Sequence, residues 1–306
     1  MMQEIHNNEI TWIHFTNLND EDILYLQEKF NIPPIAIEDF VMPTIRPKTT
    51  SHENCLFLTL LIPLFDTRIK TTYSAEVNFI LTKTHIITGT GKNDTIFQLN
   101  SFFDILKENK GKRKIFMSDT PAHLFRSLLE MLLESCFPRI DNITKKINTI
   151  EHNVFQGNEK AMVREISFIK RDILNFRRTL MPQRAVLESL ANQRTQLLPT
   201  PLLPFFHELT GVSIRIWNIL ENNKETIESL EKTNESLLSF KINDKMRIIT
   251  IFSTILLPTT LYANIFGMNT GNVPLIESSI GFWAHLSIMV CISFFTYLLF
   301  KLRKWI

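Results

Sequence analysis

A stripe of side chains recurs at three- and four-residue steps near the end of the chain, a spacing that places residues on one face of a helix. Its members are Asn243, Met246, Thr250, Ser253, Leu257, Thr260 and Asn264, with Gly267 completing the series. The polar members are carboxamides and hydroxyls, without a carboxylate, thiolate or imidazole. Such groups can hydrogen-bond to water or to a hydrated ion, but they cannot strip tightly held water from a small divalent cation.

The stripe lies in an apolar segment, residues 246–266. A carboxamide at Asn264 that faced lipid would leave its donors and acceptors unsatisfied in hydrocarbon, so we expect it to face protein or water. Small and polar residues also join membrane helices, so helix packing is an open alternative for this face. Pro258 removes one backbone hydrogen bond near the middle of the segment.

Two apolar runs, residues 246–266 and 280–300, are each long enough to cross the ~30 Å hydrocarbon core of a bilayer. Between Arg247 and Lys301 the only formally charged residue is Glu277, in the connecting loop. Lysine and arginine side chains stand just outside both ends of this hairpin. The positive-inside rule therefore predicts an integral membrane protein in a lipid bilayer, with both termini in the cytoplasm.

The first run ends in Gly267-Met268-Asn269, and a basic tail follows the second run. With this motif, and with Arg46-Pro47-Lys48 upstream, most of the chain resembles the CorA family of magnesium and divalent-cation transporters. The resemblance implies a funnel-shaped homopentamer, in which the first membrane helices line a pore and the second surround them. It also implies channel-like transport of hydrated Mg²⁺, with Co²⁺ and Ni²⁺ as further candidate ions, in a bacterial inner membrane.

The resemblance implies roles for single residues. Gly267, Met268 and Asn269 match the selectivity filter at the outer mouth, and Asn243 matches a polar ring at the cytoplasmic mouth. Met246 and Leu257 match apolar constrictions, and the remaining members of the stripe line the pore between them. The chain departs from the family at Asn264, where a small residue is commoner, and in the loop, where Glu277 does not directly follow Pro274.

Regulation is also implied by the resemblance, because CorA cytoplasmic domains bind Mg²⁺ between neighbouring subunits through acidic residues. Asp66 and Glu208 occupy similar places in this sequence. We therefore expect them to bind a regulatory Mg²⁺ that holds the pore closed, while an ordinary role as surface acids is the alternative. Mg²⁺ is thus expected as the transported and the regulatory ion, and no other cofactor is expected.

Other function classes are less consistent with the composition. The eight histidines are scattered, the three cysteines lie far apart, and no Gly-rich phosphate loop or nucleophile motif occurs, so we expect no enzyme. A formal charge of +2 is too small to indicate a nucleic-acid partner. Two alternatives stay open: a zinc transporter of the same superfamily, and a membrane-anchored oligomeric scaffold or sensor that transports nothing.

The rest of the chain must position the membrane helices, and its patterns predict an α+β cytoplasmic domain with a mixed sheet. We expect strands at residues 10–15, 55–65 and 77–88, and helices at 20–30, 35–41 and 94–106. The basic run at residues 107–114 is expected to be a solvated loop. The predicted boundaries are 1–117 for the α/β domain, 118–204 for a helical hairpin, 205–245 for a stalk, 246–269 and 280–301 for the membrane helices, 270–279 for an external loop, and 302–306 for the basic tail.

Long helices dominate after Pro121, which follows capping residues. One helix is expected to reach Val154 with a kink at Pro138, and a second, after Gly157, to run antiparallel to it up to Gln193. A third should run unbroken over residues 205–266, after a proline-rich break. Apolar residues at three- and four-residue steps along its first half predict a coiled coil between identical stalks.

Overall fold

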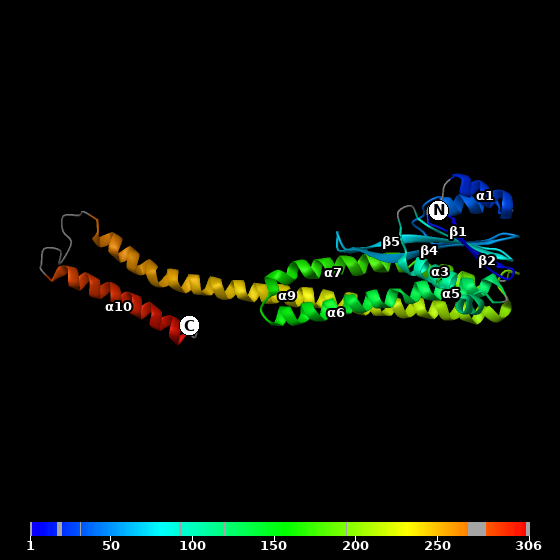
Figure 1. Cartoon of the computed structure of the whole chain (residues 1–306). Helices are drawn as coiled ribbons and strands as arrows, with labels where there is room; N and C mark the ends of the chain where they lie inside the picture. The colour runs from blue at the N-terminus through cyan, green and yellow to red at the C-terminus, as the bar shows by residue number, and fades with distance from the viewer. Residues whose placement is uncertain are drawn as a thin grey trace. The chain divides into compact units, whose positions relative to one another are not determined.

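The computed structural model describes residues 2–16, 20–30, 32–91, 94–118, 120–193, 195–268 and 280–303, and it divides the chain into two compact units (Figure 1). The N-terminal unit is Met1–Lys232 and the C-terminal unit is Thr233–Ile306. The N-terminal unit combines one mixed sheet with helices on both of its faces.

The sheet has six strands in the order β1-β2-β6-β5-β4-β3. All neighbouring strands are antiparallel except β2 and β6, which are parallel. The strands are β1 (Met2–Asn7), β2 (Ile10–Phe15), β3 (Lys48–Ser51), β4 (Leu56–Asp66), β5 (Thr71–Leu81) and β6 (His85–Thr90). The predicted mixed sheet is therefore confirmed, with β2 and β4 close to their expected bounds.

The prediction of one strand over residues 77–88 is wrong. The chain reverses between β5 and β6, where Thr82 N donates to His85 O at 2.8 Å and His85 N donates to Thr82 Oγ1 at 2.9 Å. A turn of threonine and lysine carries no glycine or proline signal, so the two strands read as one apolar run. The strand β1 was not predicted, because its alternating pattern is mostly polar.

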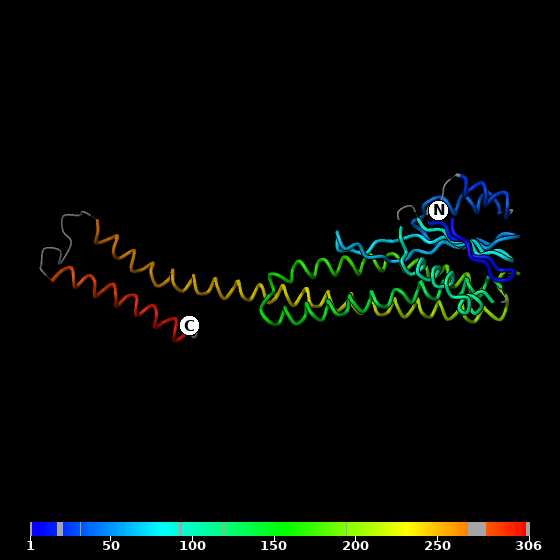
Figure 2. The backbone as a smooth tube through the Cα atoms, in the orientation of Figure 1, coloured from blue at the N-terminus to red at the C-terminus, as the bar shows by residue number. Residues whose placement is uncertain are grey.

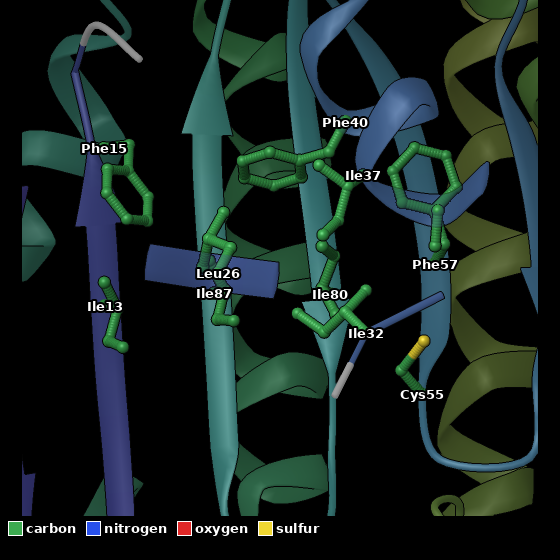
Figure 3. Close-up of a cluster of buried hydrophobic side chains, with 11 residues drawn as sticks. Ile13, Phe15, Leu26, Ile32, Ile37, Phe40, Cys55, Phe57, Ile80 and Ile87 are labelled. Atoms are coloured by element: carbon green, nitrogen blue, oxygen red, sulfur yellow. The ribbon is translucent and has the colours of Figure 1, made fainter. Parts of the chain in front are cut away.

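One face of the sheet is covered by α1 (Asp20–Phe30) and α2 (Pro34–Val41), both at their predicted positions. Figure 3 shows Leu26 and Phe40 of these helices above Ile13, Ile80 and Ile87 of three neighbouring strands. On the other face, Phe79 of β5 meets Phe125 at a ring distance of 5.6 Å, and Trp12 of β2 meets Phe103 at 4.8 Å. Apolar residues on both faces explain why the central strands read as continuous apolar runs.

Two short helices follow the sheet, α3 (Phe97–Glu108) and α4 (Lys110–Phe116). The expectation of a loop at residues 107–114 is wrong, because α3 and α4 occupy nearly all of this run. Asn109 separates them and caps α4, since its side chain accepts a hydrogen bond from Lys112 N at 3.0 Å. The basic residues are helical, yet most of them are exposed, as expected of a solvated face.

The helical hairpin consists of α5 (Pro121–Glu134), α6 (Cys136–Phe155), α7 (Glu159–Leu180) and α8 (Gln183–Asn192). The break between α5 and α6 confirms the predicted effect of Pro138, whose ring clashes with the carbonyl of Glu134 in a continuous helix. Gly157 turns the chain with φ 92°, and α6 and α7 then lie side by side (Figure 2). The second helix does not continue to Gln193, because Pro182 interrupts it and starts α8.

After the short 3-10 helix η1 (Thr200–Leu202), α9 (Leu203–Phe266) runs without a break through Pro258, as predicted. Its apolar seam does not form the predicted coiled coil between copies over this stretch. The seam is buried by helices of the same chain; its members are Leu209, Val212, Ile216, Leu220, Ile227 and Leu230. Asn223 Nδ2 donates to Thr144 Oγ1 of α6 at 2.9 Å, and Lys170 of α7 pairs with Glu231 at 2.6 Å.

The C-terminal unit holds the end of α9 and α10 (Gly281–Leu302). Within the described residues, these two helices are the ones long and apolar enough to cross a membrane, in agreement with the two predicted spans. Their apolar side chains are largely uncovered in a single chain; Ile248 is 68% exposed and Phe282 is 71% exposed. A surface of this kind requires lipid or further protein around it.

Candidate functional site

The predicted stripe lies on one uncovered face of α9. The helix is regular here, so about 100° of rotation per residue brings its members to the same side. All of them are exposed in the single chain: Asn243, Met246, Thr250, Ser253, Leu257, Thr260 and Asn264. The structure therefore brings together every predicted member of the stripe from Asn243 to Asn264.

The opposite face of α9 is the one that α10 covers. Thr259 and Ser293 share a hydrogen bond between their hydroxyls at 2.9 Å, and Tyr262 OH lies 2.7 Å from His285 Nδ1. Thr259 and Tyr262 are half-buried, as is Phe266 one turn further on. By helical geometry this contact face lies roughly 170° from the stripe. Packing between α9 and α10 within one chain therefore does not explain the polar groups of the stripe.

Two hydroxyls of the stripe donate their protons to the backbone of α9. Thr250 Oγ1 donates to Met246 O at 2.8 Å, and Thr260 Oγ1 donates to Leu256 O at 2.9 Å. Each bond uses the hydroxyl proton and leaves the oxygen lone pairs as acceptors. The face therefore offers acceptor oxygens to whatever lies in front of it, with no formal charge among the stripe residues.

Gly267 follows the last residue of α9 and closes the helix with a hydrogen bond from its N–H to Ala263 O at 2.8 Å. Gly267 does not have a positive φ, so backbone angles barred to other residues are not the reason for glycine at this position. The structure gives another reason, because a Cβ at this position would lie 3.0 Å from Ala263 O. Met268 is 61% exposed, so it does not hold the turn by packing within its own chain.

Asn269 and residues 270–279 lie outside the described residues, as do residues 304–306 of the basic tail. The predicted outer ring of Asn269 and the loop acid Glu277 therefore stay predictions. The helix α9 ends at Phe266, three residues before Asn269, so the structure establishes only the helix end that precedes the predicted ring.

The two predicted regulatory acids lie on different elements of the N-terminal unit. Asp66 ends β4, and its Oδ1 accepts a hydrogen bond from Arg68 N at 2.7 Å in the turn that follows. Glu208 is exposed in the second turn of α9. Within the described residues, no group of three or more His, Cys, Asp or Glu side chains could hold a metal ion. A Mg²⁺ shared between neighbouring copies through these acids stays a prediction.

The contact between Tyr262 and His285 was not predicted from the sequence, where the histidines were noted only as scattered. The available signal was an imidazole inside an apolar membrane span, because ionisable residues in such spans are rare and need a partner. His285 has that partner on the neighbouring helix.

The sequence matches the CorA-like Mg²⁺ transporter protein family over residues 7–303. The cobalt/magnesium transport protein CorA of Thermotoga maritima is 29% identical over 300 residues, which cover 97% of this chain and 83% of that protein. The zinc transport protein ZntB of Yersinia enterocolitica is 19% identical, over 96% of this chain and 88% of that protein. The solved structure of the CorA magnesium transporter from Methanocaldococcus jannaschii superposes with a TM-score of 0.84 at 20% identity, over 97% of this chain and 92% of that chain. This chain shares its fold.

Proposed function

The chain belongs to the CorA-like Mg²⁺ transporter family, and from this premise we propose that it conducts hydrated Mg²⁺ through a pore lined by copies of α9. The membership confirms the resemblance expected from the sequence, and it identifies a divalent-cation transporter rather than an enzyme. The ion, the Asn269 ring and the homopentamer belong to the proposal. The observation that carries it is the uncovered polar face of α9 opposite α10.

The chemistry of this face suits a cation that keeps its water shell. A hydrated cation presents water hydrogens, so the wall around it needs acceptor oxygens. Thr250 and Thr260 supply hydroxyl lone pairs, because their protons are donated to the helix backbone. Asn243 and Asn264 add carboxamide oxygens to the same face. Neutral acceptors hold the water shell without replacing it, which lets the ion bind and leave.

The same residues favour Mg²⁺ over Zn²⁺ as the cargo. Zn²⁺ prefers direct bonds to histidine, cysteine or carboxylate side chains, whereas Mg²⁺ dehydrates reluctantly and keeps several waters in protein sites. The stripe from Asn243 to Gly267 contains none of the three zinc-binding types. A chain with the family's fold and this stripe is therefore proposed to pass hydrated Mg²⁺, with hydrated Co²⁺ and Ni²⁺ as competitors.

One helix face cannot enclose a pathway, so the proposal needs several copies around an axis. We place α9 inside and α10 outside, because α10 covers the side of α9 that faces away from the stripe. Five copies follow from the resemblance to CorA. The exposed apolar side chains of α10 would then face lipid, and the basic residues outside the hairpin would lie at the cytoplasmic side of a bacterial inner membrane.

Ion flux through the full-length protein in liposomes tests this proposal. Liposomes that contain a Mg²⁺-sensitive dye should show uptake with the wild-type chain. The variant Asn269→Ala should abolish uptake while leaving an oligomer of normal size, because the ring that recognises the water shell is gone. The variant Asn272→Ala is the matched control, since it removes an identical side chain three residues further along and should conduct normally.

Three outcomes would contradict parts of the proposal. Absence of flux through the wild-type chain would support a scaffold or sensor. Full flux through Asn269→Ala, in an oligomer of normal size, would reduce the motif to a helix end without a role in permeation. Uptake of Zn²⁺ that exceeds uptake of Mg²⁺ under equal gradients would favour a zinc transporter.

A further inference from the structure

Three rings join the last turn of α9 to the first turns of α10. The hydroxyl of Tyr262 lies 2.7 Å from His285 Nδ1. The ring of Phe266 lies 4.7 Å from that of His285 and 4.5 Å from that of Tyr262. Phe266 directly precedes Gly267, so this ring cluster sits at the point where α9 ends.

The imidazole of His285 has one polar connection within the described residues. Its Nδ1 meets Tyr262, while its Nε2 is buried without a hydrogen-bond partner. A buried imidazole nitrogen without a partner is costly, so packing of rings alone would favour an apolar residue at this position. The hydrogen bond to Tyr262 is the feature that an apolar ring could not supply.

This contact lies on the side of the last turns of α9 that faces α10. Tyr262 and Asn264 are two residues apart in the sequence. At about 100° of rotation per residue, they therefore lie roughly 160° from each other around the helix. With Tyr262 held against α10, Asn264 must point away from α10, where it is exposed. The next turn, with Gly267 bound to Ala263 O, continues from this fixed orientation.

We propose that His285 is a positioning residue, which through Tyr262 sets the rotation of the end of α9 and so aims Asn264 at the ion pathway. The inference rests on the proposed function, because it assigns His285 to the outer mouth of the same pore. His285 itself does not touch the ion. Loss of the bond lets the last turn rotate, and the Asn264 carboxamides of the copies then no longer match the water shell of the cation.

The second hydrogen bond between the helices provides a matched control. Thr259 and Ser293 join α9 to α10 at 2.9 Å, about one turn further from the outer end. If any bond between the helices served equally well, Ser293→Ala and Tyr262→Phe would have the same effect. Under the proposal only the bond nearest the mouth controls the orientation of Asn264, so Ser293→Ala keeps wild-type flux and ion preference.

The test is Mg²⁺ and Co²⁺ uptake by full-length protein in liposomes, with oligomer size and thermal unfolding measured on the same samples. Tyr262→Phe removes one oxygen and keeps the ring, and His285→Leu removes both nitrogens. Each is expected to reduce the preference for Mg²⁺. Each should also lower maximal Mg²⁺ uptake by about tenfold, a factor that corresponds to the free energy of one lost hydrogen bond. His285→Asn, which can place an amide near the position of Nδ1, should restore part of the uptake.

The double variant Tyr262→Phe/His285→Leu is expected to be no worse than either single variant, because both remove the same interaction. Unchanged maximal uptake and ion preference in Tyr262→Phe would overturn the inference while leaving the proposed function in place. An equal loss in Ser293→Ala would overturn it as well, by reducing the contact to general helix packing. Absence of Mg²⁺ uptake by the wild-type chain would instead overturn the proposed function, and the inference with it.

Discussion

The N-terminal and C-terminal units differ in whether their side chains find their contacts within the same chain. In the N-terminal unit, Asp172 is 1% exposed and accepts hydrogen bonds from Thr72 N at 2.7 Å and Thr72 Oγ1 at 2.6 Å. Its other oxygen pairs with Arg139, whose guanidinium lies 3.6 Å from the ring of Phe65. In the C-terminal unit, large apolar side chains are open on most sides. The N-terminal unit buries its apolar side chains within its own chain, whereas those of the C-terminal unit require lipid or further protein around them.

The helix α9 shows the same contrast along its own length. Leu220 is fully buried within the N-terminal unit, while Leu257 is 67% exposed in the C-terminal unit. Both residues belong to series with three- and four-residue steps, so the pattern is the same and the surroundings differ. A helical stripe therefore indicates a face with a partner, but it does not identify that partner.

The largest expected effect comes from removing the buried carboxylate of Asp172. Asp172→Ala leaves the amide and hydroxyl of Thr72 and the guanidinium of Arg139 buried without their acceptor. Breaking a buried pair in this way costs about 3–5 kcal/mol. Chemical unfolding of the full-length protein in detergent should show this loss.

Glu188→Ala is the control, because its pair with Arg184 is exposed on α8 at 2.8 Å. Exposed pairs of this spacing contribute only about 0.3–0.5 kcal/mol. An equal loss in both variants would mean that the N-terminal unit does not depend on its buried polar network.

A second test places the same substitution in both halves of α9. Leu220→Ala opens a cavity in a closed core and should lower the free energy of unfolding by about 2–5 kcal/mol. Leu257→Ala should leave that free energy within about 0.5 kcal/mol, because the side chain is largely exposed in the chain. It should instead raise Mg²⁺ leak in liposomes by widening the proposed apolar constriction. Similar losses in the free energy of unfolding for the two variants would contradict the contrast between the buried first half of α9 and its exposed second half.

The smallest expected effect concerns pH. Burial lowers the pKa of His14 from its ordinary value of 6.5, while hydrogen bonds to Asn100 and Thr88 partly oppose that shift. The unfolded chain therefore binds the proton more readily, and the free energy of unfolding falls as pH drops below 6.5. His14→Gln should flatten this fall in unfolding measurements between about pH 7 and 5. An equally steep fall in His14→Gln would show that other groups dominate.

The elements that could be predicted are those that depend on local properties of the chain. Pro138 and the two apolar spans act through covalent geometry and hydropathy, which are local properties, so their positions agreed with expectation. The turn between β5 and β6 was predicted wrongly because it carries no glycine or proline signal, and α4 was predicted as a loop because its basic run contains Gly111. Their structure depends on hydrogen bonds of Thr82 and Asn109 that composition does not reveal.

The membrane hairpin, the polar stripe and the Gly267-Met268-Asn269 motif were determined by the sequence alone, because length, hydropathy and helical spacing are visible without a fold. The tertiary structure decided which side of α9 meets α10, and therefore that the stripe stays uncovered. It also decided that the seam ending at Leu230 packs inside its own chain, and that His285 finds Tyr262. These choices depend on which apolar faces meet in space, and equal spacing along a helix cannot distinguish a partner in the same chain from a partner in another copy.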